Sequence, residues 1–368
     1  MLLKNQDSVL PLDFDRLRKI AVCGPNADEV SFAHTHYGPL YAPATSVLQG
    51  LRAKAEAHGV SVSYAKGCEL VDEHWPESEI IDYPLTPQEQ ADIEEAVEKA
   101  SESDAVIAVL GGGLRTCGEN KSRSSLDLPG RQLHLLKALC ATGKPVVLVL
   151  INGRPLSINW AAQNVPAILE AWYPGTHGGE AVADVIAGDY NPGGKLTVTF
   201  PKSAGQIPLN FPAKPFSQAD GGKKPGQKGD MTRLNGPLYP FGYGLSYTTF
   251  AYADLTLSAP SITDKQSIDV QFTVTNTGSR EGDEVVQLYT RDVQSTVTTY
   301  EKNLRGFERV HLKPGQHKRI TITLHPEDLQ LLNADGHWTV EPGEFKVMIG
   351  ASSEDIRLTG TFSVTPSR

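Results

Sequence analysis

The sequence is poor in the residues that build metal sites, disulfide frameworks and membrane spans. Its 368 residues contain four cysteines, and none of them forms a CxxC pair. Neither a zinc site nor a disulfide scaffold is therefore indicated. No apolar run approaches the roughly 20 residues that a membrane-spanning helix needs. The first 20 residues show no long apolar core or small-residue cleavage site, so we see no signal peptide.

The charge balance argues against a nucleic-acid partner. The net charge is −9 with a pI near 5.6, and no basic face is present to neutralise the phosphates of a nucleic acid. At 368 residues the chain is long for one hydrophobic core, which predicts two domains. Such a chain does not need disulfides, so we expect the cysteines to be free or packed. Cys68 and Cys117 are the pair most worth testing.

Several common catalytic signatures are missing as well. There is no GxSxG nucleophile elbow and no HExxH metal motif, and the lysine spacing of a P-loop is absent. No GxGxxG follows the apolar run that includes Val109, which argues against phosphate binding by the glycines there. His34 and His36 are the one closely spaced histidine pair, and a loop role is favoured over metal ligation.

The first half of the chain alternates apolar strand-like runs with segments of helical period. Strands buried on both faces and separated by helices predict a mostly parallel sheet in an α/β three-layer sandwich. The expected strands are 19–27, 60–67, 104–113, 144–156 and 166–175, and the expected helices are 46–59, 86–103, 129–143 and 178–194. The helix over 86–103 opens on Thr86, Pro87 and Glu89, and the helix over 178–194 is stopped by Gly188.

The second half consists of short, alternating, β-branched strands separated by Gly- and Pro-containing turns. This pattern predicts an all-β, immunoglobulin/fibronectin III-like antiparallel sandwich. The clearest strand segments are 253–260, 267–278, 282–292, 317–326 and 343–352. We place the domains at 1–245 and 246–368, with a long loop rich in Pro, Gly and Lys over 202–238.

Glu119 is the carboxylate with most catalytic interest. It lies in a polar loop just after Gly111–Gly113, and in parallel sheets such loops, at the carboxyl ends of strands, meet ligands. A carboxylate there can serve as a general acid. The alternative is a solvated loop glutamate paired with Lys121 or Arg123.

Two aromatic residues follow another strand end, in the loop 173–179 and just before it. Trp172 and Tyr173 can form a stacking platform for a sugar ring. They can equally be core aromatics, and the spacing alone favours the core.

Taken together, these segments resemble family 3 glycoside hydrolases, the β-glucosidase and β-xylosidase group. The resemblance extends over essentially the whole chain and rests on long motifs in the family's order. In the α/β half they are LLKNQDSVLPL, GENKSRSSLDLPGRQ, EAWYPGTHGGEAVADVIAGDYNPGGKLTVTFP and LYPFGYGLSYTTF. In the β half they are VTNTGSREGDEVVQLYTRD, LRGFERVHLKPGQ and WTVEPGEFKVMIGASS.

The resemblance implies a role for Glu119 as the family's general acid/base, on a loop that reaches over a neighbouring barrel. The family retains anomeric configuration and needs two carboxylates about 5–5.5 Å apart. The nucleophilic aspartate belongs to the N-terminal barrel, and this chain begins after it. Asp104 is a poor substitute because it opens a buried strand. We therefore expect this chain alone to be inactive on glycosides.

The resemblance also implies partners and location. The substrate would be a β-linked oligosaccharide or glucoside, with β-glucosidase favoured over β-xylosidase, and no cofactor is implied. Arg123, Trp172 and Tyr173 are candidate substrate-binding residues. The barrel would act in cis or in trans, and the full-length family is periplasmic or secreted. The face that docks on the barrel should expose a large apolar patch near 111–128 and 173–179.

Two further hypotheses remain open. One is a non-catalytic remnant or a module that binds carbohydrate or a protein partner. The other is an independent flavodoxin-like nucleotide binder, which calorimetry with nucleotides would test.

Overall fold

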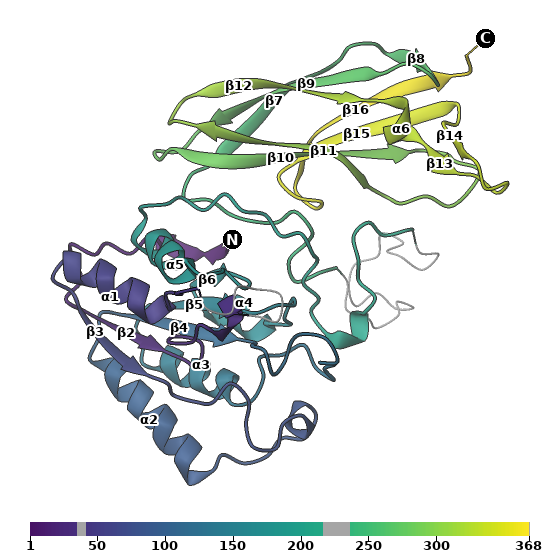
Figure 1. Cartoon of the computed structure of the whole chain (residues 1–368). Helices are drawn as coiled ribbons and strands as arrows, with labels where there is room; N and C mark the ends of the chain where they lie inside the picture. Colours follow the sequence, from purple (N-terminus) through teal and green to yellow (C-terminus); the bar gives the residue numbers. More distant parts are fainter. Residues whose placement is uncertain (35–41, 216–235, 368) are drawn as a thin grey trace, which may run out of the picture. The chain divides into compact units, whose positions relative to one another are not determined.

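The chain divides into two compact units (Figure 1). The structure is a computed structural model, and it describes residues 1–34, 42–215 and 236–367. The first unit comprises Met1–Pro192 and Phe200–Ile207. The second comprises Gly193–Thr199 and the described part of 208–368.

The first unit is built on a six-stranded sheet with the order β1-β6-β5-β4-β2-β3. Five strands run parallel, and β1 pairs with β6 in the antiparallel direction at one edge. Strands β4 and β5 are buried along their whole length, which accounts for their unbroken apolar sequences. The strands are β1 (Leu2–Asn5), β2 (Lys19–Cys23), β3 (Ser61–Ala65), β4 (Ala105–Gly111), β5 (Val146–Ile151) and β6 (Ala167–Glu170).

Helices cover both faces of this sheet, with α1 and α5 on one face and α2 and α3 on the other (Figure 1). The predicted start of α2 is confirmed, because Thr86 and Glu89 form a reciprocal capping box. The predicted end of α5 is confirmed too, since Gly188 adopts a left-handed conformation with φ of 85°. The helices are α1 (Val47–Ala57), α2 (Pro87–Ser101), α3 (Gln132–Ala141), α4 (Asn159–Asn164) and α5 (Gly178–Ala187).

The second unit is a β-sandwich of two sheets, with the orders β11-β10-β15-β16-β8 and β12-β9-β7. Residues of β9 alternate between buried and half-buried positions, as expected for a strand with one face on a core. The elements are β7 (Phe250–Leu257), β8 (Ser261–Thr263), β9 (Ile268–Asn276), β10 (Gly282–Asp292), β11 (Asn303–Leu312), β12 (His317–Leu324), α6 (Pro326–Leu329), β13 (Leu331–Leu332), β14 (Trp338–Thr339), β15 (Gly343–Gly350) and β16 (Ile356–Thr365).

The predicted α/β sandwich followed by a fibronectin-like β domain is confirmed, with additions. Strand β1 was not predicted, because its four residues gain their structure from pairing with β6 some 165 residues later. In the second unit β8 pairs parallel with β16, although the rest of that sheet is antiparallel. Residues 193–199 group with the second unit, where Leu196 exchanges backbone hydrogen bonds with Gly242 and Tyr243. The domain boundary at 245/246 stays a prediction.

Candidate functional site

The carboxyl end of β4 is fixed by buried amide side chains. Gly111 has a φ of +130°, and a Cβ there would lie 2.2 Å from the Ile151 carbonyl oxygen on β5, so only glycine fits. The Gln132 amide accepts from the Gly111 N–H at 2.7 Å and donates to its carbonyl at 2.8 Å. The Asn26 amide donates to the Gly112 carbonyl at 3.0 Å. The loop that follows therefore leaves the sheet from a rigid base.

Glu119 lies at the tip of this loop. The chain first turns at Thr116, whose backbone N–H donates to the Gly113 carbonyl at 2.9 Å. Gly118 and Asn120, on either side of Glu119, have positive φ values of 139° and 60°. Glu119 is exposed, and its carboxylate forms no hydrogen bond or ion pair with any residue that the structure describes. The pairing with Lys121 or Arg123 that the sequence left open is thus not formed.

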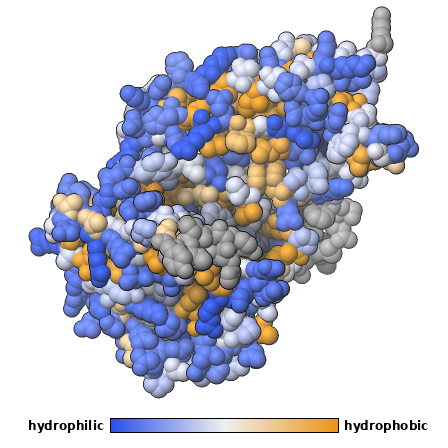
Figure 2. All heavy atoms as spheres, viewed as in Figure 1, coloured by the Kyte–Doolittle hydropathy of each residue, from blue (hydrophilic) through white to orange (hydrophobic). Residues whose placement is uncertain are grey.

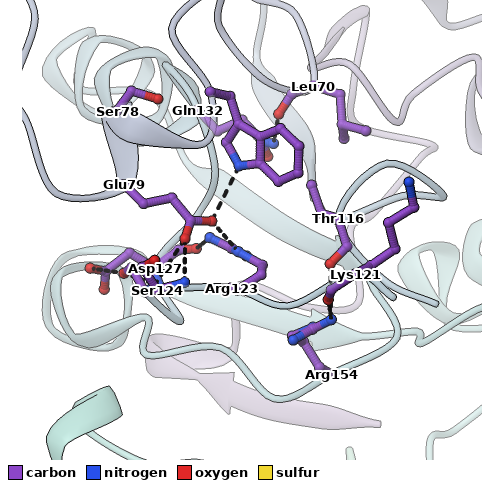
Figure 3. A network of polar contacts seen from close by, with 12 residues as sticks. Leu70, Ser78, Glu79, Thr116, Lys121, Arg123, Ser124, Asp127, Gln132 and Arg154 are labelled. Atoms are coloured by element: carbon purple, nitrogen blue, oxygen red, sulfur yellow. Dashed lines mark hydrogen bonds and ion pairs between the residues drawn. The ribbon is translucent and has the colours of Figure 1, made fainter. Parts of the chain in front are cut away.

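Arg154 joins the two ends of the loop segment that carries Glu119. It lies just after β5, and one terminal nitrogen of its guanidinium donates to the carbonyls of Thr116 at 3.0 Å and Lys121 at 2.8 Å. These two carbonyls lie on opposite sides of Glu119 in the sequence. Asn152 in turn donates to the Arg154 carbonyl at 2.8 Å. Figure 3 shows the Lys121 side chain directed away from Arg154.

Glu79 holds the returning side of the loop (Figure 3). It ends the short 3-10 turn η3 (Glu77–Glu79), and its side chain is 2% exposed. Its carboxylate accepts from the Arg123 guanidinium at 2.5 Å. It also accepts from the backbone N–H groups of Ser124 at 2.6 Å and Ser125 at 3.0 Å. One carboxylate therefore fixes three consecutive loop residues.

The contacts between Glu79 and residues 123–125 form a clamp, and its electrostatics favour the charged form of Glu79. Burial opposes the charge, but the hydrogen bonds from Arg123 and from the Ser125 and Ser124 N–H groups outweigh it and hold the pKa of Glu79 below its ordinary value. The Trp75 indole N–H adds a further hydrogen bond at 3.2 Å.

Arg123, a candidate substrate-binding residue, has a buried guanidinium. Its side chain is 2% exposed and is shared between the Glu79 carboxylate and the Asp127 carbonyl, the latter at 2.9 Å. In this arrangement Arg123 shapes the loop from within. Direct contact with substrate stays a prediction.

Trp172 packs within the first unit. Its backbone has a φ of 53° and donates to the Glu170 carboxylate at 2.9 Å. Its half-buried ring lies tilted against Phe200, with a centroid distance of 5.8 Å. The geometry matches the core-aromatic alternative, and sugar stacking by Trp172 stays a prediction.

Tyr173 packs beneath the start of the Glu119 loop. Its ring stacks on Phe32 with a centroid distance of 6.3 Å. A Cβ at Gly153 would lie 2.6 Å from the Cys117 sulfur and 2.8 Å from the Tyr173 ring, so these three residues are in close contact. Burial raises the pKa of the Tyr173 hydroxyl above its ordinary value. A role for Tyr173 in sugar binding stays a prediction, as for Trp172.

Glu170, at the end of β6, is 1% exposed. It accepts the Trp172 N–H and, at 3.3 Å, the Asn152 amide. Burial raises the pKa of Glu170 to about 8, so the group is largely protonated at neutral pH. A buried, neutral carboxyl group of this kind supports the loop backbone and is not poised to attack a substrate.

The large apolar patch expected beside the two loops is not found among the described residues. Within 111–128 and 173–179 none of the large apolar side chains is exposed. Ile80 and Ile81, next to Glu79 in the sequence, are 74% and 47% exposed and form a small exposed apolar patch. Over the face in view, Figure 2 shows apolar side chains interspersed with polar ones.

Asp104 and Glu119 lie at opposite ends of strand β4. It precedes β4 and accepts the backbone N–H groups of Arg18 at 2.7 Å and Lys19 at 3.0 Å, which lower its pKa. The seven residues of β4 place the two strand ends about 20 Å apart. Asp104 is therefore a structural residue and cannot pair with Glu119 as a nucleophile.

All four cysteines, including Cys68 and Cys117, are free thiols in the structure. Among the described residues there is no cluster of His, Cys, Asp and Glu suited to a metal ion. In the same residues, no helix combines the length and apolar character required to cross a membrane. His36 and residues 216–235 of the predicted long loop lie outside the described residues.

The residues that shape the site were largely missed by sequence reasoning. Glu79, Gln132 and Arg154 act through backbone groups that are distant along the chain. Glu170 binds the nearby Trp172 N–H and the Asn152 amide, which is 18 residues away. Periodicity carries no trace of such contacts. For Arg154, the one available signal is its position directly after a buried strand, at the edge where Glu119 lies.

Comparison with known proteins identifies the family. Residues 1–247 match the glycosyl hydrolase family 3 C-terminal domain. The chain belongs to glycoside hydrolase family 3. Residues 284–353 match the fibronectin type III-like domain.

Several relatives match over nearly the whole chain. A β-xylosidase from Formosa agariphila is 44% identical over 96% of this chain and 47% of its own length. A periplasmic β-glucosidase from Salmonella typhimurium is 41% identical over 99% of this chain and 48% of its own length. The structure of a β-glucosidase from Erythrobacter marinus superposes with a TM-score of 0.87 at 38% identity, covering 99% of this chain and 49% of that one. The chain thus spans about half the length of the relatives it matches.

Proposed function

We propose that this chain forms the C-terminal part of a retaining β-glycosidase and that Glu119 is its general acid/base. The observation that carries the proposal is an exposed carboxylate, without a partner among the described residues, on a loop held from both sides at the carboxyl edge of a parallel sheet. In this role Glu119 protonates the leaving glycosidic oxygen. It then removes a proton from the water that hydrolyses the glycosyl-enzyme.

The nucleophile would come from outside the described residues. Retention requires a second carboxylate about 5–5.5 Å from the first. Glu79 is committed to Arg123, and Glu170 is buried and protonated at neutral pH, so neither suits the task. We infer that an N-terminal barrel domain supplies the nucleophile, in the same polypeptide or as a separate chain. Without the barrel the chain would be inactive.

The substrate would be a terminal β-linked sugar. We favour a β-glucoside, and a β-xyloside is the second candidate because the 44% identical relative is named a β-xylosidase. The name of the periplasmic β-glucosidase from Salmonella typhimurium supports a periplasmic or secreted location for the complete enzyme. A non-catalytic remnant or binding module is the competing proposal.

The test is a chimera in which the N-terminal half of that Salmonella β-glucosidase precedes this chain. We expect hydrolysis of 4-nitrophenyl β-glucoside, with 4-nitrophenyl β-xyloside assayed in parallel. Glu119→Gln should lower the rate about 10²–10⁴-fold, the usual contribution of a general acid. Glu73→Gln, at an exposed carboxylate, is the matched control. A folded chimera that hydrolyses neither substrate, or that is unaffected by Glu119→Gln, would favour the non-catalytic alternative.

A further inference from the structure

A single guanidinium closes the loop that carries Glu119. Both the Thr116 and the Lys121 carbonyl oxygens lie within hydrogen-bonding distance of the same Arg154 nitrogen, at 3.0 and 2.8 Å. The two ends of the tip are therefore tied to one atom, and that atom is tied to the end of β5. Figure 3 shows Arg154 beneath both residues.

Arg154 is suited to this task by its chemistry. A guanidinium is always charged and rigid, and carbonyl oxygens are its natural acceptors when no carboxylate competes. Arg154 forms no ion pair with a carboxylate in the part of the chain that the structure describes, so these carbonyls are its partners there. The Asn152 amide fixes the Arg154 backbone at 2.8 Å, and Asn152 itself is fully buried. Arg154 is thus anchored to a buried residue just after β5.

We propose that Arg154 is a positioning residue for proton transfer by Glu119. The inference rests on the proposed function, because it assigns Arg154 a task in that same reaction. Glu119 has no side-chain partner of its own among the described residues, so the loop backbone sets the direction of its carboxylate. A misplacement of about 1 Å in a catalytic group can cost about 10²-fold in rate. The two hydrogen bonds from Arg154 to the Thr116 and Lys121 carbonyls form a bracket around Glu119. Loss of this bracket should therefore impair proton donation while the rest of the site stays intact.

The test separates proton donation from general damage by the choice of leaving group. In the chimera described above, kcat/KM is measured for phenyl β-glucoside and for 2,4-dinitrophenyl β-glucoside. The phenyl leaving group needs a proton from the acid, whereas the dinitrophenolate is stable enough to leave without one. The variants are Arg154→Leu, Arg154→Lys and Lys121→Met. Lys121→Met is the matched control because it removes one positive charge from the loop but leaves the Lys121 carbonyl in place.

We expect Arg154→Leu to lower kcat/KM for phenyl β-glucoside about 10²-fold and for the dinitrophenyl substrate less than about 10-fold. Arg154→Lys keeps a cationic donor and should recover part of the loss. Lys121→Met should behave like the parent chimera. Equal losses on both substrates after Arg154→Leu would show a merely structural role and overturn the proposal.

A second measurement, on this chain alone, tests the bracket without any activity. The Cys117 and Lys121 backbone N–H groups donate to carbonyls within the loop, at 3.0 and 3.2 Å. Arg154→Leu should speed hydrogen exchange across 116–122 by about tenfold or more, as local opening becomes easier. Unchanged exchange would overturn the bracket. If the parent chimera shows no hydrolysis, the proposed function fails, and exchange alone then decides whether Arg154 holds the loop.

Discussion

Replacing Glu79 by glutamine should show how strongly one carboxylate holds the candidate acid/base loop. Each Glu79 oxygen accepts two donors, Arg123 and Trp75 on one and the Ser124 and Ser125 N–H groups on the other. A glutamine keeps one acceptor oxygen and turns an N–H group toward the remaining donors. The Arg123 guanidinium would then be buried without a counter-charge.

The cost can be estimated from these contacts. Leaving one buried hydrogen-bonding group unsatisfied costs about 1–3 kcal/mol, and removing one partner of a buried ion pair costs about 3–5 kcal/mol. Because both side chains are 2% exposed, screening by solvent is weak. We expect Glu79→Gln to lower the free energy of unfolding of the first unit by about 3–4 kcal/mol at pH 7.

The effect should depend on pH in a defined direction. The folded-state pKa of Glu79 is lowered, so its stabilising contribution is present above the ordinary value and is lost as pH falls through the folded-state value. The difference between parent and variant should therefore be largest near neutral pH and shrink on acidification below about pH 4.5.

The assay is urea unfolding followed by tryptophan fluorescence, since Trp75 lies in the clamp. Glu77→Gln removes the same charge from an exposed position two residues away, and it should change stability by less than about 0.5 kcal/mol. If Glu79→Gln were no less stable than Glu77→Gln at pH 7, or if its loss of stability persisted in acid, the contacts of Glu79 with residues 123–125 would not stabilise the first unit.

Three further predictions concern stability. Burial raises the pKa of Glu170 to about 8, so the parent should lose stability as pH rises from about 4.5 to about 8. Glu170→Gln should remove this loss, and urea unfolding across that pH range tests it. Lys195→Met leaves Glu284 buried without its partner at 2.9 Å, and calorimetry should show the second unit weakened by about 3–5 kcal/mol. Gly111→Ala should cost about 3 kcal/mol or more in urea, whereas Gly143→Ala, which meets no atom, should cost about 1 kcal/mol.

Local sequence signals predicted the elements of this fold well. The start of α2 follows from Thr86 and Glu89, whose side chains cap each other's backbone N–H groups within one turn. The buried strands β4 and β5 follow from unbroken apolar runs. Strand β1 could not be predicted in this way, because a four-residue edge strand is stabilised by a partner far along the chain.

In the candidate site, too, some residues could be predicted from the sequence and others could not. Glu119 was proposed from its position after a strand end and from family resemblance, both of which are readable in the sequence. Its supports were not. Arg154 binds backbone carbonyls, and two of the donors to Glu79 are backbone N–H groups, which nearly every residue carries. The Arg123 partner of Glu79 is 44 residues away along the chain. A guanidinium that binds carbonyl oxygens leaves no complementary acid in the sequence to reveal it.

The separation between the Glu119 carboxylate and the cations of its loop has a chemical rationale. A general acid must exchange protons with substrate, so its carboxylate cannot be neutralised by a fixed cation in the resting protein. If Glu119 is the proposed acid, the loop meets that demand because its cations bind elsewhere: Arg123 on Glu79, and Arg154 on two carbonyls. Rigidity is thus supplied through the backbone, while the Glu119 carboxylate stays exposed and without a partner among the described residues. In the proposed role of Glu119, the same arrangement explains why removing Arg154 should misdirect the carboxylate, whereas removing the exposed Lys121 side chain should not.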